Sequence, residues 1–509
     1  MLRRKRDHDP RAFAQANVGG LAQFSPRFWL LVCLTGIAAG LGAIAMMALL
    51  HTVQHLAFAY HTGEYSTAAA ARSAVRRVVV VTIGGVVAGL GWWALRTKLG
   101  GSGGEPTRAV WSGSGEMSLW RTVISGAISE VMIGLGGSLG REAAPQHTGA
   151  AFGAWIARQF ELPREQRLLL IACGAGAGVG AVYNVPLAGA LFAAELYLSS
   201  ISLATVVPAL VTSGIATAVG WLYLPKRPIY PVAALPFPSA SLLVFALLAG
   251  PLIGLAAAGF VKLIVWASDH RPSGRALLLS PPLAFAVLGS LAIPYPLLLG
   301  NGRDLALFAF RAQGALGTLA ALALLKPLVT SMCLRSGASG GLFTPTLSTG
   351  AVLAAFLGHV WAHVWPGASI EACSIVGAAA MLGTAMRAPV AAIAFTIELT
   401  DTVNASMVAI LLALGGALLV ARALERRSIY TARLPAMVRA RSILLGPERD
   451  RLRGDQHPAA QPGSQVGGAD RANGELEPSV EAHGDLAPGA EVEHVDDRGG
   501  GARDARGGE

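Results

Sequence analysis

The sequence is short of charged residues. Asp, Glu, Lys and Arg make up 14% of its 509 residues, whereas an ordinary soluble domain carries about 25%. Acidic residues are the scarcest: residues 1–446 hold 16 of them against 33 basic residues, while residues 447–509 hold 14 against 7. Because 53% of the chain is hydrophobic, this composition excludes an ordinary soluble enzyme, a disordered protein and a coiled coil.

Cysteine is also rare, which excludes a disulfide-stapled secreted domain. His51 and His55 have the i, i+4 spacing of a metal-binding pair, but no third ligand follows nearby. We therefore expect no bound metal, no cofactor and buried free thiols. The four cysteines are Cys33, Cys173, Cys333 and Cys373.

The sequence contains several long apolar runs without charged residues. About 20 helical residues cross the hydrocarbon core of a bilayer, and strand-like alternation is absent, which argues against an outer-membrane barrel. The sequence therefore predicts an all-α polytopic membrane protein, and the first run lacks the cleavage site of a removable signal peptide. The predicted spans are Phe28–Leu50, Val78–Leu95, Leu168–Ala194, Leu198–Pro225, Pro236–Val261, Ala276–Gly300, Val403–Ala421 and, more weakly, Leu305–Leu325.

Basic clusters at both ends predict the orientation. The segment 1–27 begins with Met-Leu-Arg-Arg-Lys-Arg, and the arginine-rich segment Arg422–Arg441 follows the last span. The positive-inside rule places both in the cytoplasm of a cell-membrane protein, so the basic charge reflects topology and anionic lipid rather than nucleic acid. Residues 447–509 lack aromatics and are rich in Gly and acidic residues, which predicts a disordered tail.

The chain repeats itself. Residues 174–196 match residues 377–399 at a constant offset of 203, and nine identities include Pro186/Pro389, Phe192/Phe395 and Glu195/Glu398. This predicts two homologous halves, at 28–225 and 235–440, with broken helices around a central site at their interface. An odd number of spans in each half would make the repeat inverted.

Four glutamates stand in apolar surroundings: Glu130, Glu142, Glu195 and Glu398. A carboxylate at membrane depth costs about 2.5 kcal/mol or more unless it is paired, hydrated or protonated. A helix-end glutamate at the membrane surface is the simpler interpretation, above all for Glu130, which nothing nearby singles out. Lys326 is interpreted in the same way, as a helix-end residue that reaches the surface.

The setting of Glu142 is different because a glycine-rich turn precedes it. Glycines before a helix leave backbone N–H groups free to point at an anion, and the positive end of the helix dipole adds to the attraction. Each turn alone could serve close helix packing, but three in a repeated membrane protein favour an anion site. These turns are Gly100–Gly104, Gly136–Gly140 and Gly337–Gly341.

At this point the motifs resemble those of the CLC chloride channel and chloride/proton antiporter family. The resemblance extends over residues 27–440 and implies a homodimer in which each subunit has its own anion pathway. The motifs are Gly101-Ser102-Gly103, Gly140-Arg141-Glu142, Asn184–Gly189, Gly341–Pro345, Arg387-Ala388-Pro389, Glu398–Asp401 and Ser428-Ile429-Tyr430.

The resemblance also implies roles for single residues. Ser102 and Tyr430 would donate their hydroxyl groups to a chloride ion at the central site, and the backbone N–H groups of Leu342 and Phe343 would complete the cage. Glu142 would be the gate and proton acceptor, because its carboxylate competes with chloride for the outer position.

Two departures from the family pattern matter. Pro106 and Pro145 each lie one position later than usual, so Gly103 is the alternative to Ser102 at the central site. Proton-coupled members usually carry a second, inward-facing glutamate where this chain has Leu196, directly after Glu195. Leucine cannot relay a proton, which leaves Glu195 as a candidate for the proton path.

The sequence thus predicts selective transport of chloride or a similar small anion, with chloride and protons as partners. Chloride/proton antiport gated by Glu142 is the preferred interpretation, and a passive voltage- or pH-gated chloride channel is the alternative. A transporter of organic substrates would need a larger pocket. An enzyme is not expected, because no nucleophile–base pair or metal cluster is present.

Overall fold

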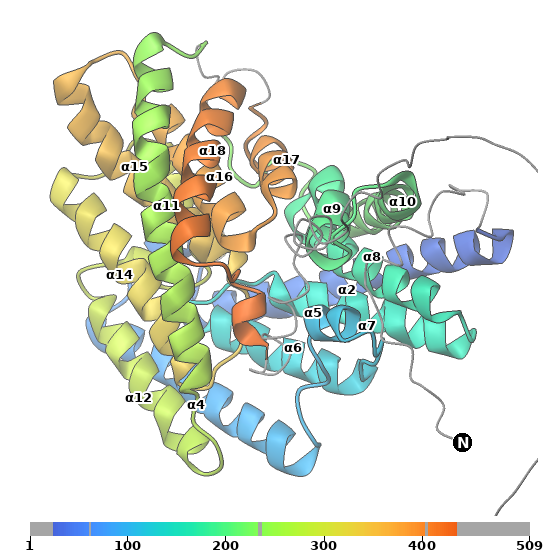
Figure 1. The fold of residues 1–509 in the computed structure, drawn as a ribbon. Helices are drawn as coiled ribbons and strands as arrows, with labels where there is room; N and C mark the ends of the chain where they lie inside the picture. The colour runs from blue at the N-terminus through green and yellow to red at the C-terminus, as the bar shows by residue number, and fades with distance from the viewer. Residues whose placement is uncertain (1–23, 61–62, 233–236, 403–405, 435–509) are drawn as a thin grey trace, which may run out of the picture. The chain divides into compact units, whose positions relative to one another are not determined.

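The computed structural model describes residues 24–60, 63–232, 237–402 and 406–434 (Figure 1). All regular structure in these residues is helical, and an isolated bridge joins Gly140 of the first half to Gly341 of the second. The predicted all-α fold is confirmed. Most of the N-terminal segment 1–27 and the whole tail 447–509 lie outside the described residues.

The first half begins with a long helix and continues through helices of varied length. Several begin at Pro, which is well tolerated in the first turn because its missing N–H would have no helical partner there. The elements are α2 (Pro26–Phe58), α3 (Tyr65–Ala70), α4 (Ala74–Lys98), α5 (Pro106–Trp111), α6 (Leu119–Gly134), α7 (Ala143–Gln159), α8 (Arg164–Tyr183), α9 (Pro186–Phe192), the π-helical turn η2 (Ala193–Tyr197) and α10 (Leu203–Gly220).

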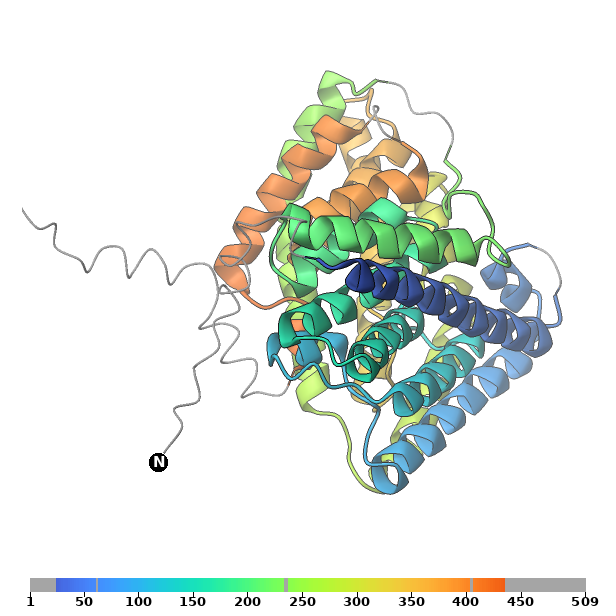
Figure 2. The same cartoon turned by 90° about the vertical axis from the view of Figure 1, so that its right-hand side faces the viewer.

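The second half repeats this order of elements about 200 residues later. Its long first helix, α11, packs along its last helix, α18, as α2 packs along α10 in the first half (Figures 1 and 2). The elements are α11 (Ala240–Asp269), α12 (Ala276–Leu291), η3 (Pro296–Leu298), α13 (Arg303–Phe310), α14 (Leu316–Arg335), α15 (Phe343–Val364), α16 (Ile370–Met386), α17 (Pro389–Thr400), α18 (Met407–Leu424) and η4 (Thr431–Arg433).

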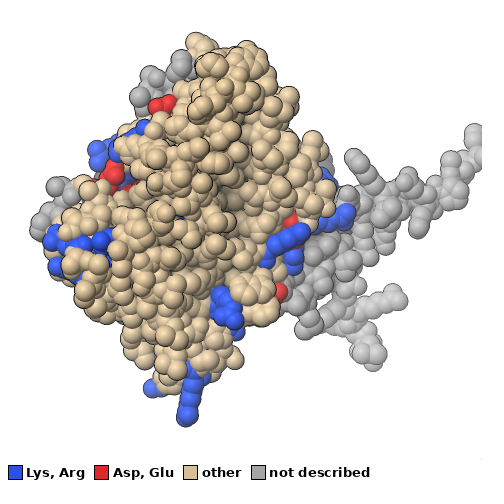
Figure 3. Space-filling view, turned by 90° about the vertical axis from the view of Figure 1, so that its left-hand side faces the viewer, with Lys and Arg blue, Asp and Glu red and all other residues tan. Residues whose placement is uncertain are grey.

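Eight helices in the described residues are long and apolar enough to cross a membrane: α2, α4, α8, α10, α11, α14, α15 and α18. Large apolar side chains such as Leu41, Leu247 and Leu419 are exposed on them, and the face in Figure 3 is uncharged over most of its area. Exposed apolar surface of this extent suits contact with lipid rather than water. The chain is a multi-pass membrane protein.

Three predicted spans are wrong in their boundaries. The run Leu168–Ala194 is broken into α8 and α9, the helix predicted over Ala276–Gly300 ends at Leu291, and Leu305–Leu325 is divided between α13 and α14. Five further helices lie outside the predicted runs, and charged residues such as Arg121 in α6 and Arg158 in α7 interrupt the apolar stretches of some of them. They are α6, α7, α15, α16 and α17.

The breaks after α8 and α16 have the same cause. Each helix ends at a residue in the left-handed region, Asn184 at φ +57° and Arg387 at φ +59°. A proline follows two positions later, and its ring disfavours helical backbone in the residue before it. The next helix, α9 or α17, therefore starts in a new direction, and α9 and α17 pack against each other.

Small residues set how closely the inner helices approach. A Cβ on Gly174 of α8 would lie 2.2 Å from the carbonyl oxygen of Gly149 in α7, and a Cβ on Gly350 of α15 would lie 2.5 Å from the carbonyl oxygen of Gly377 in α16. No side chain fits at such distances, so glycine is required at both contacts. This packing fixes α7 and α15, whose N-termini form the site described next.

Candidate functional site

Two glycine loops pair with each other at the centre of the protein. The backbone N–H of Gly140 donates to the carbonyl oxygen of Gly341 at 2.7 Å, and the N–H of Gly341 donates back to Gly140 at 2.6 Å. Each loop leads directly into a helix, α7 or α15. The reciprocal bonds therefore hold two helix N-termini side by side.

The carboxylate of Glu142 lies between these helix starts and is buried, with 1% of the residue exposed. It accepts hydrogen bonds from the backbone N–H of Phe343 at 2.8 Å and from the Tyr183 hydroxyl at 2.9 Å. The Thr344 hydroxyl is 3.4 Å away and is itself 2.5 Å from the Tyr183 hydroxyl. Hydrogen bonds to a charged group are worth about 1.5–3 kcal/mol each, and the N-terminus of α15 adds a favourable dipole.

The paired glycines leave the space that this carboxylate fills. A Cβ on Gly341 would lie 1.8 Å from Glu142 Oε1, and a Cβ on Gly140 would lie 2.3 Å from both carboxylate oxygens. Any side chain at either position would displace the carboxylate. Glycine is thus required at both positions to leave room for the carboxylate.

Cationic charge lies close to the same pocket. The guanidinium carbon of Arg141 is 5.5 Å from the ring centroid of Tyr183, a cation–π distance. Together with the N–H and O–H donors, this makes the position of the Glu142 carboxylate suitable for a small anion. The pocket supplies hydrogen-bond donors and positive potential.

Aromatic rings connect the Glu142 pocket to Tyr430. Tyr183 stacks on Phe343 at a centroid distance of 5.4 Å, and Phe343 contacts Phe395 at 4.6 Å. Phe192 contacts Phe395 at 5.8 Å and Tyr430 at 5.6 Å. The residues predicted for the outer and central positions, Glu142 and Tyr430, therefore lie at two ends of one packed row of side chains.

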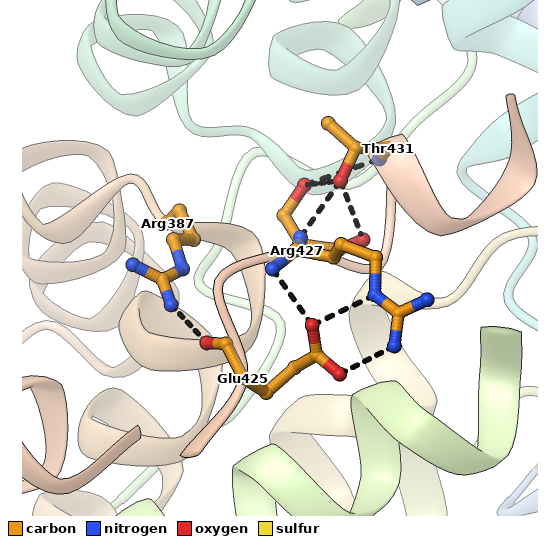
Figure 4. A network of polar contacts seen from close by, with 5 residues as sticks. Arg387, Glu425, Arg427 and Thr431 are labelled. Carbon is orange, nitrogen blue, oxygen red and sulfur yellow. Dashed lines mark hydrogen bonds and ion pairs between the residues drawn. The ribbon is translucent and has the colours of Figure 1, made fainter. Parts of the chain in front are cut away.

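A polar network holds the segment that carries Tyr430 (Figure 4). The Arg427 guanidinium binds the Glu425 carboxylate through two hydrogen bonds of 2.7 Å, and Arg387 donates to the Glu425 carbonyl oxygen. Farther along, the backbone N–H of Ser428 donates to the Thr431 hydroxyl at 2.8 Å. These contacts position the turn between α18 and η4, where Tyr430 is buried.

Glu425 lies just past α18, and two effects oppose each other on its carboxyl. Burial raises its pKa, while the hydrogen bonds and positive charge of Arg427 lower it. The net result is a pKa below the ordinary value of 4.5. The carboxyl thus stays ionised, and the bidentate pair with Arg427 persists at neutral pH.

Ser102 lies in a different environment from the other predicted site residues. It is exposed, in a turn where Gly100, Gly101, Gly103 and Gly104 all have positive φ. A Cβ on Gly103, the alternative position, would lie 2.3 Å from the hydroxyl oxygen of Thr122 at the start of α6. The turn is therefore packed at Gly103 and open at Ser102.

Glu195 and Glu398 each cap a broken helix. Glu195 accepts from the backbone N–H groups of Val390 and Ala391 in the first turn of α17, at 3.2 and 2.7 Å. Glu398 does the same for Leu187 and Ala188 of α9 at the same distances. The carboxylate of Glu195, the candidate for the proton path, is thus engaged at a helix N-terminus, beside the buried side chain of Leu196.

The comparisons with known proteins identify the family. The family model described as "Voltage gated chloride channel" matches residues 84–422, about two thirds of the chain. The chain belongs to this family, the CLC family.

Curated relatives and solved structures agree with the family assignment. The voltage-gated ClC-type chloride channel ClcB of Salmonella dublin is 28% identical over 413 residues, covering 79% of this chain and 97% of that protein. The H(+)/Cl(-) exchange transporter ClcA of Yersinia pestis bv. Antiqua is 30% identical over 349 residues, covering 66% of this chain and 72% of the other.

Among solved structures, a slow cyanobacterial Cl−/H+ antiporter matches with a TM-score of 0.71 at 23% identity, covering 84% of this chain and all of that one. A CLC-type fluoride/proton antiporter matches with a TM-score of 0.65 at 19% identity, covering 80% of this chain and 97% of the other. At these identities the matches establish the CLC fold.

Two side chains of the Glu142 pocket, Tyr183 and Thr344, were not among the predicted site residues. Both lie inside or next to motifs of the CLC resemblance: Tyr183 directly precedes Asn184, and Thr344 stands between Phe343 and Pro345. Their positions beside a helix break and a glycine turn were the feature of the sequence that could have indicated them. What it could not supply was the contact between α8 and α15 that brings them together.

The prediction that Lys326 reaches the membrane surface is wrong. It is fully buried within α14 rather than extended to the membrane surface. Its ammonium group donates to the Ser138 hydroxyl at 2.9 Å and to the carbonyl oxygens of Gly300 and Leu298 at 3.1 and 3.3 Å. Lys326 therefore anchors the 136–140 loop, which presents Glu142.

Proposed function

We propose that the protein transports chloride, or a similar small anion, across a cell membrane in exchange for protons, with Glu142 as the gate. The observation that carries the proposal is the buried Glu142 carboxylate bonded to Phe343 N–H and the Tyr183 hydroxyl. Donors that hold a carboxylate at a helix N-terminus also suit a halide ion. Chloride would therefore compete with the Glu142 carboxylate for one position.

Protonation is the switch in this mechanism. The carboxylate accepts hydrogen bonds from three donors and gains from the dipole of α15 because it is negatively charged. A neutral carboxyl loses most of that attraction and releases the position to chloride. When chloride leaves, the deprotonated carboxylate returns. Each cycle of opening thus takes up and releases one proton, which links anion movement to proton movement.

A second anion position belongs to the same proposal. Tyr430, with Leu342 and Phe343 N–H groups and either Ser102 or the Gly103 turn, would hold chloride at the central site. The aromatic row from Phe343 to Tyr430 supports this placement. Since Ser102 is exposed, Tyr430 is the hydroxyl donor that the proposal relies on most.

The relatives support exchange as the mode of transport. The Yersinia pestis relative is named a proton/chloride exchange transporter, and the cyanobacterial structure is described as a Cl−/H+ antiporter. Leu196 carries no titratable group, so coupling in this chain would use a proton route that does not include that position.

Assembly and topology complete the proposal. We expect a homodimer with an anion pathway in each subunit and both termini in the cytoplasm. We also expect the two halves to be inverted relative to each other. The reciprocal contacts between α9 and α17 support this, because a pair of contacts in which i meets j and j meets i has two-fold symmetry.

Reconstitution in liposomes tests the function itself. Purified protein is placed in vesicles loaded with chloride, and chloride efflux and proton uptake are recorded together. The internal and external pH are equal at the start. The proposal predicts that chloride efflux drives protons into the vesicles. Chloride efflux without proton uptake would replace exchange with the channel alternative, and the absence of anion flux would contradict the proposal altogether.

The central site has its own test in chloride binding measured by calorimetry. Tyr430→Phe removes only the hydroxyl, so affinity should fall by about 10-fold or more, the value of one hydrogen bond to an ion. Ser102→Ala is measured beside it. Unchanged chloride affinity in both variants would show that neither the Tyr430 nor the Ser102 hydroxyl binds chloride at the central site.

A further inference from the structure

Glu130 is a buried acid that the proposed function does not yet use. It lies near the end of α6 and is 0% exposed. Neither of its carboxyl oxygens has a hydrogen-bond partner among the described residues. The other buried acids differ: Asp304 accepts from the Ser66 N–H at 2.7 Å and pairs with Arg303, and Glu142 has the donors described above.

The surroundings of Glu130 place it beside the gate. It shares one face of α6 with Gly126, where a Cβ would lie 3.2 Å from Ala144 in the first turn of α7. The preceding residue, Ser129, donates to the carbonyl oxygen of Ser339, in the loop that leads to Gly341. The charged groups that act electrostatically on Glu130 are Arg141 and Glu142.

An ionised carboxylate without donors is strongly disfavoured in an apolar interior, whereas the neutral acid is not. Glu130 therefore holds its proton while Glu142 holds its charge. Two neighbouring carboxyl groups in opposite protonation states can pass one proton between them, directly or through a water molecule. Leu196 cannot do this, and the Glu195 carboxylate caps α17.

We propose that Glu130 is the second proton-exchanging carboxyl of the transport cycle and hands its proton to Glu142. The proposal rests on the proposed function. The O–H bond of Glu130 breaks and an O–H bond forms on Glu142, whose neutral carboxyl then leaves its position to chloride. The negative charge moves to Glu130, where Arg141 offsets it. Glu142 then releases the proton to one side of the membrane, and Glu130 regains one from water connected to the other side.

The transport test compares Glu130→Gln with the wild type in liposomes. Glutamine keeps the shape of the side chain but cannot release a proton, so proton uptake should fall by about 100-fold, the usual value of a positioned acid or base. Chloride flux should persist, because Glu142 and its donors are unchanged. Glu398→Gln is the matched control: it makes the same substitution at a half-buried capping glutamate and should retain proton uptake.

Each outcome of the transport test decides the proposal. Proton uptake lost in Glu130→Gln alone supports it. Proton uptake equal to that of the wild type overturns it, as does loss of chloride flux together with proton uptake in the folded variant. A wild type that moves chloride without protons overturns this proposal but leaves anion transport standing. A wild type that moves no anion overturns the proposed function instead.

Infrared spectroscopy tests the protonation state without depending on transport. The spectrum of the wild type minus that of Glu130→Gln should contain the carbonyl stretch of a protonated carboxylic acid. No such band would overturn the proposal. If glutamine at this position prevents folding, Glu130→Met replaces it in both experiments. An apolar side chain of similar size should raise the Tm, since it removes an unpartnered buried polar group.

Discussion

Glu195, in the first half of the protein, caps a helix of the second half, and Glu398, in the second half, caps a helix of the first. Glu195, in η2 directly after α9, caps the start of α17, and Glu398, near the end of α17, caps the start of α9, through N–H···O distances of 3.2 and 2.7 Å in both cases. The two residues are 203 positions apart, the same offset as the sequence repeat. The internal repeat is thus expressed as a reciprocal pair of helix caps at the contact between the halves.

This reciprocity predicts equal stability losses. Glu195→Leu and Glu398→Leu each remove a charged cap and leave two N–H groups unsatisfied, at a cost of about 1–2 kcal/mol. Both variants should lower the Tm in detergent by a similar amount. Glu116→Leu, at an exposed position before α6, is the control and should change the Tm little. Unequal losses would show that the two caps are not equivalent.

Gly341→Ala tests the space around the gate. The added Cβ would lie 1.8 Å from Glu142 Oε1, so the carboxylate should be pushed out of its position without any loss of its charge. We expect chloride flux that responds less to pH than that of the wild type. Gly415→Ala is the control, because a Cβ there meets no atom within 4 Å. A wild-type pH response in Gly341→Ala would show that the gate does not need this space.

The Glu425–Arg427 pair predicts a pH dependence of stability. The pKa of Glu425 is lowered in the folded protein, so its stabilising contribution is complete above the carboxyl's ordinary pKa of 4.5. That contribution is lost as the pH falls through the lowered folded value. Glu425→Gln should have a lower Tm than the wild type at pH 7. In acid the two Tm values should lie closer together. If the difference in Tm between the two proteins stays constant from pH 7 into acid, the ion pair does not contribute to stability.

Sequence patterns predicted most of the architecture and part of the site. Scarce charge, long apolar runs and the 203-residue offset were enough for a repeated helical membrane protein, because these properties act over many residues. Glycine turns identified Glu142 for a local reason, since a helix start and its preceding loop lie within one motif. The same reasoning found Phe343 at the start of α15.

Contacts between distant elements were beyond sequence reasoning. Tyr183 and Thr344 meet the Glu142 carboxylate only because α8 packs against α7 and the Gly140–Gly341 bridge brings the start of α15 beside them. The surroundings of Glu130 also depend on packing: α2 and α7 cover a face of α6 whose sequence has no distinctive motif. Lys326 was misjudged for the same reason, as a lysine in an apolar helix is usually near its end, and the buried carbonyl groups that hold it belong to other segments.

The gate is tested most directly by Glu142→Gln in liposomes, with chloride efflux and proton uptake recorded together over a range of pH. Glutamine resembles the protonated, open form of the glutamate and cannot titrate. The account predicts chloride efflux that no longer depends on pH and is accompanied by no proton uptake. Glu116→Gln, the same substitution at an exposed position, should behave as the wild type does. A Glu142→Gln protein that keeps both the pH dependence and the proton uptake of the wild type would contradict the account.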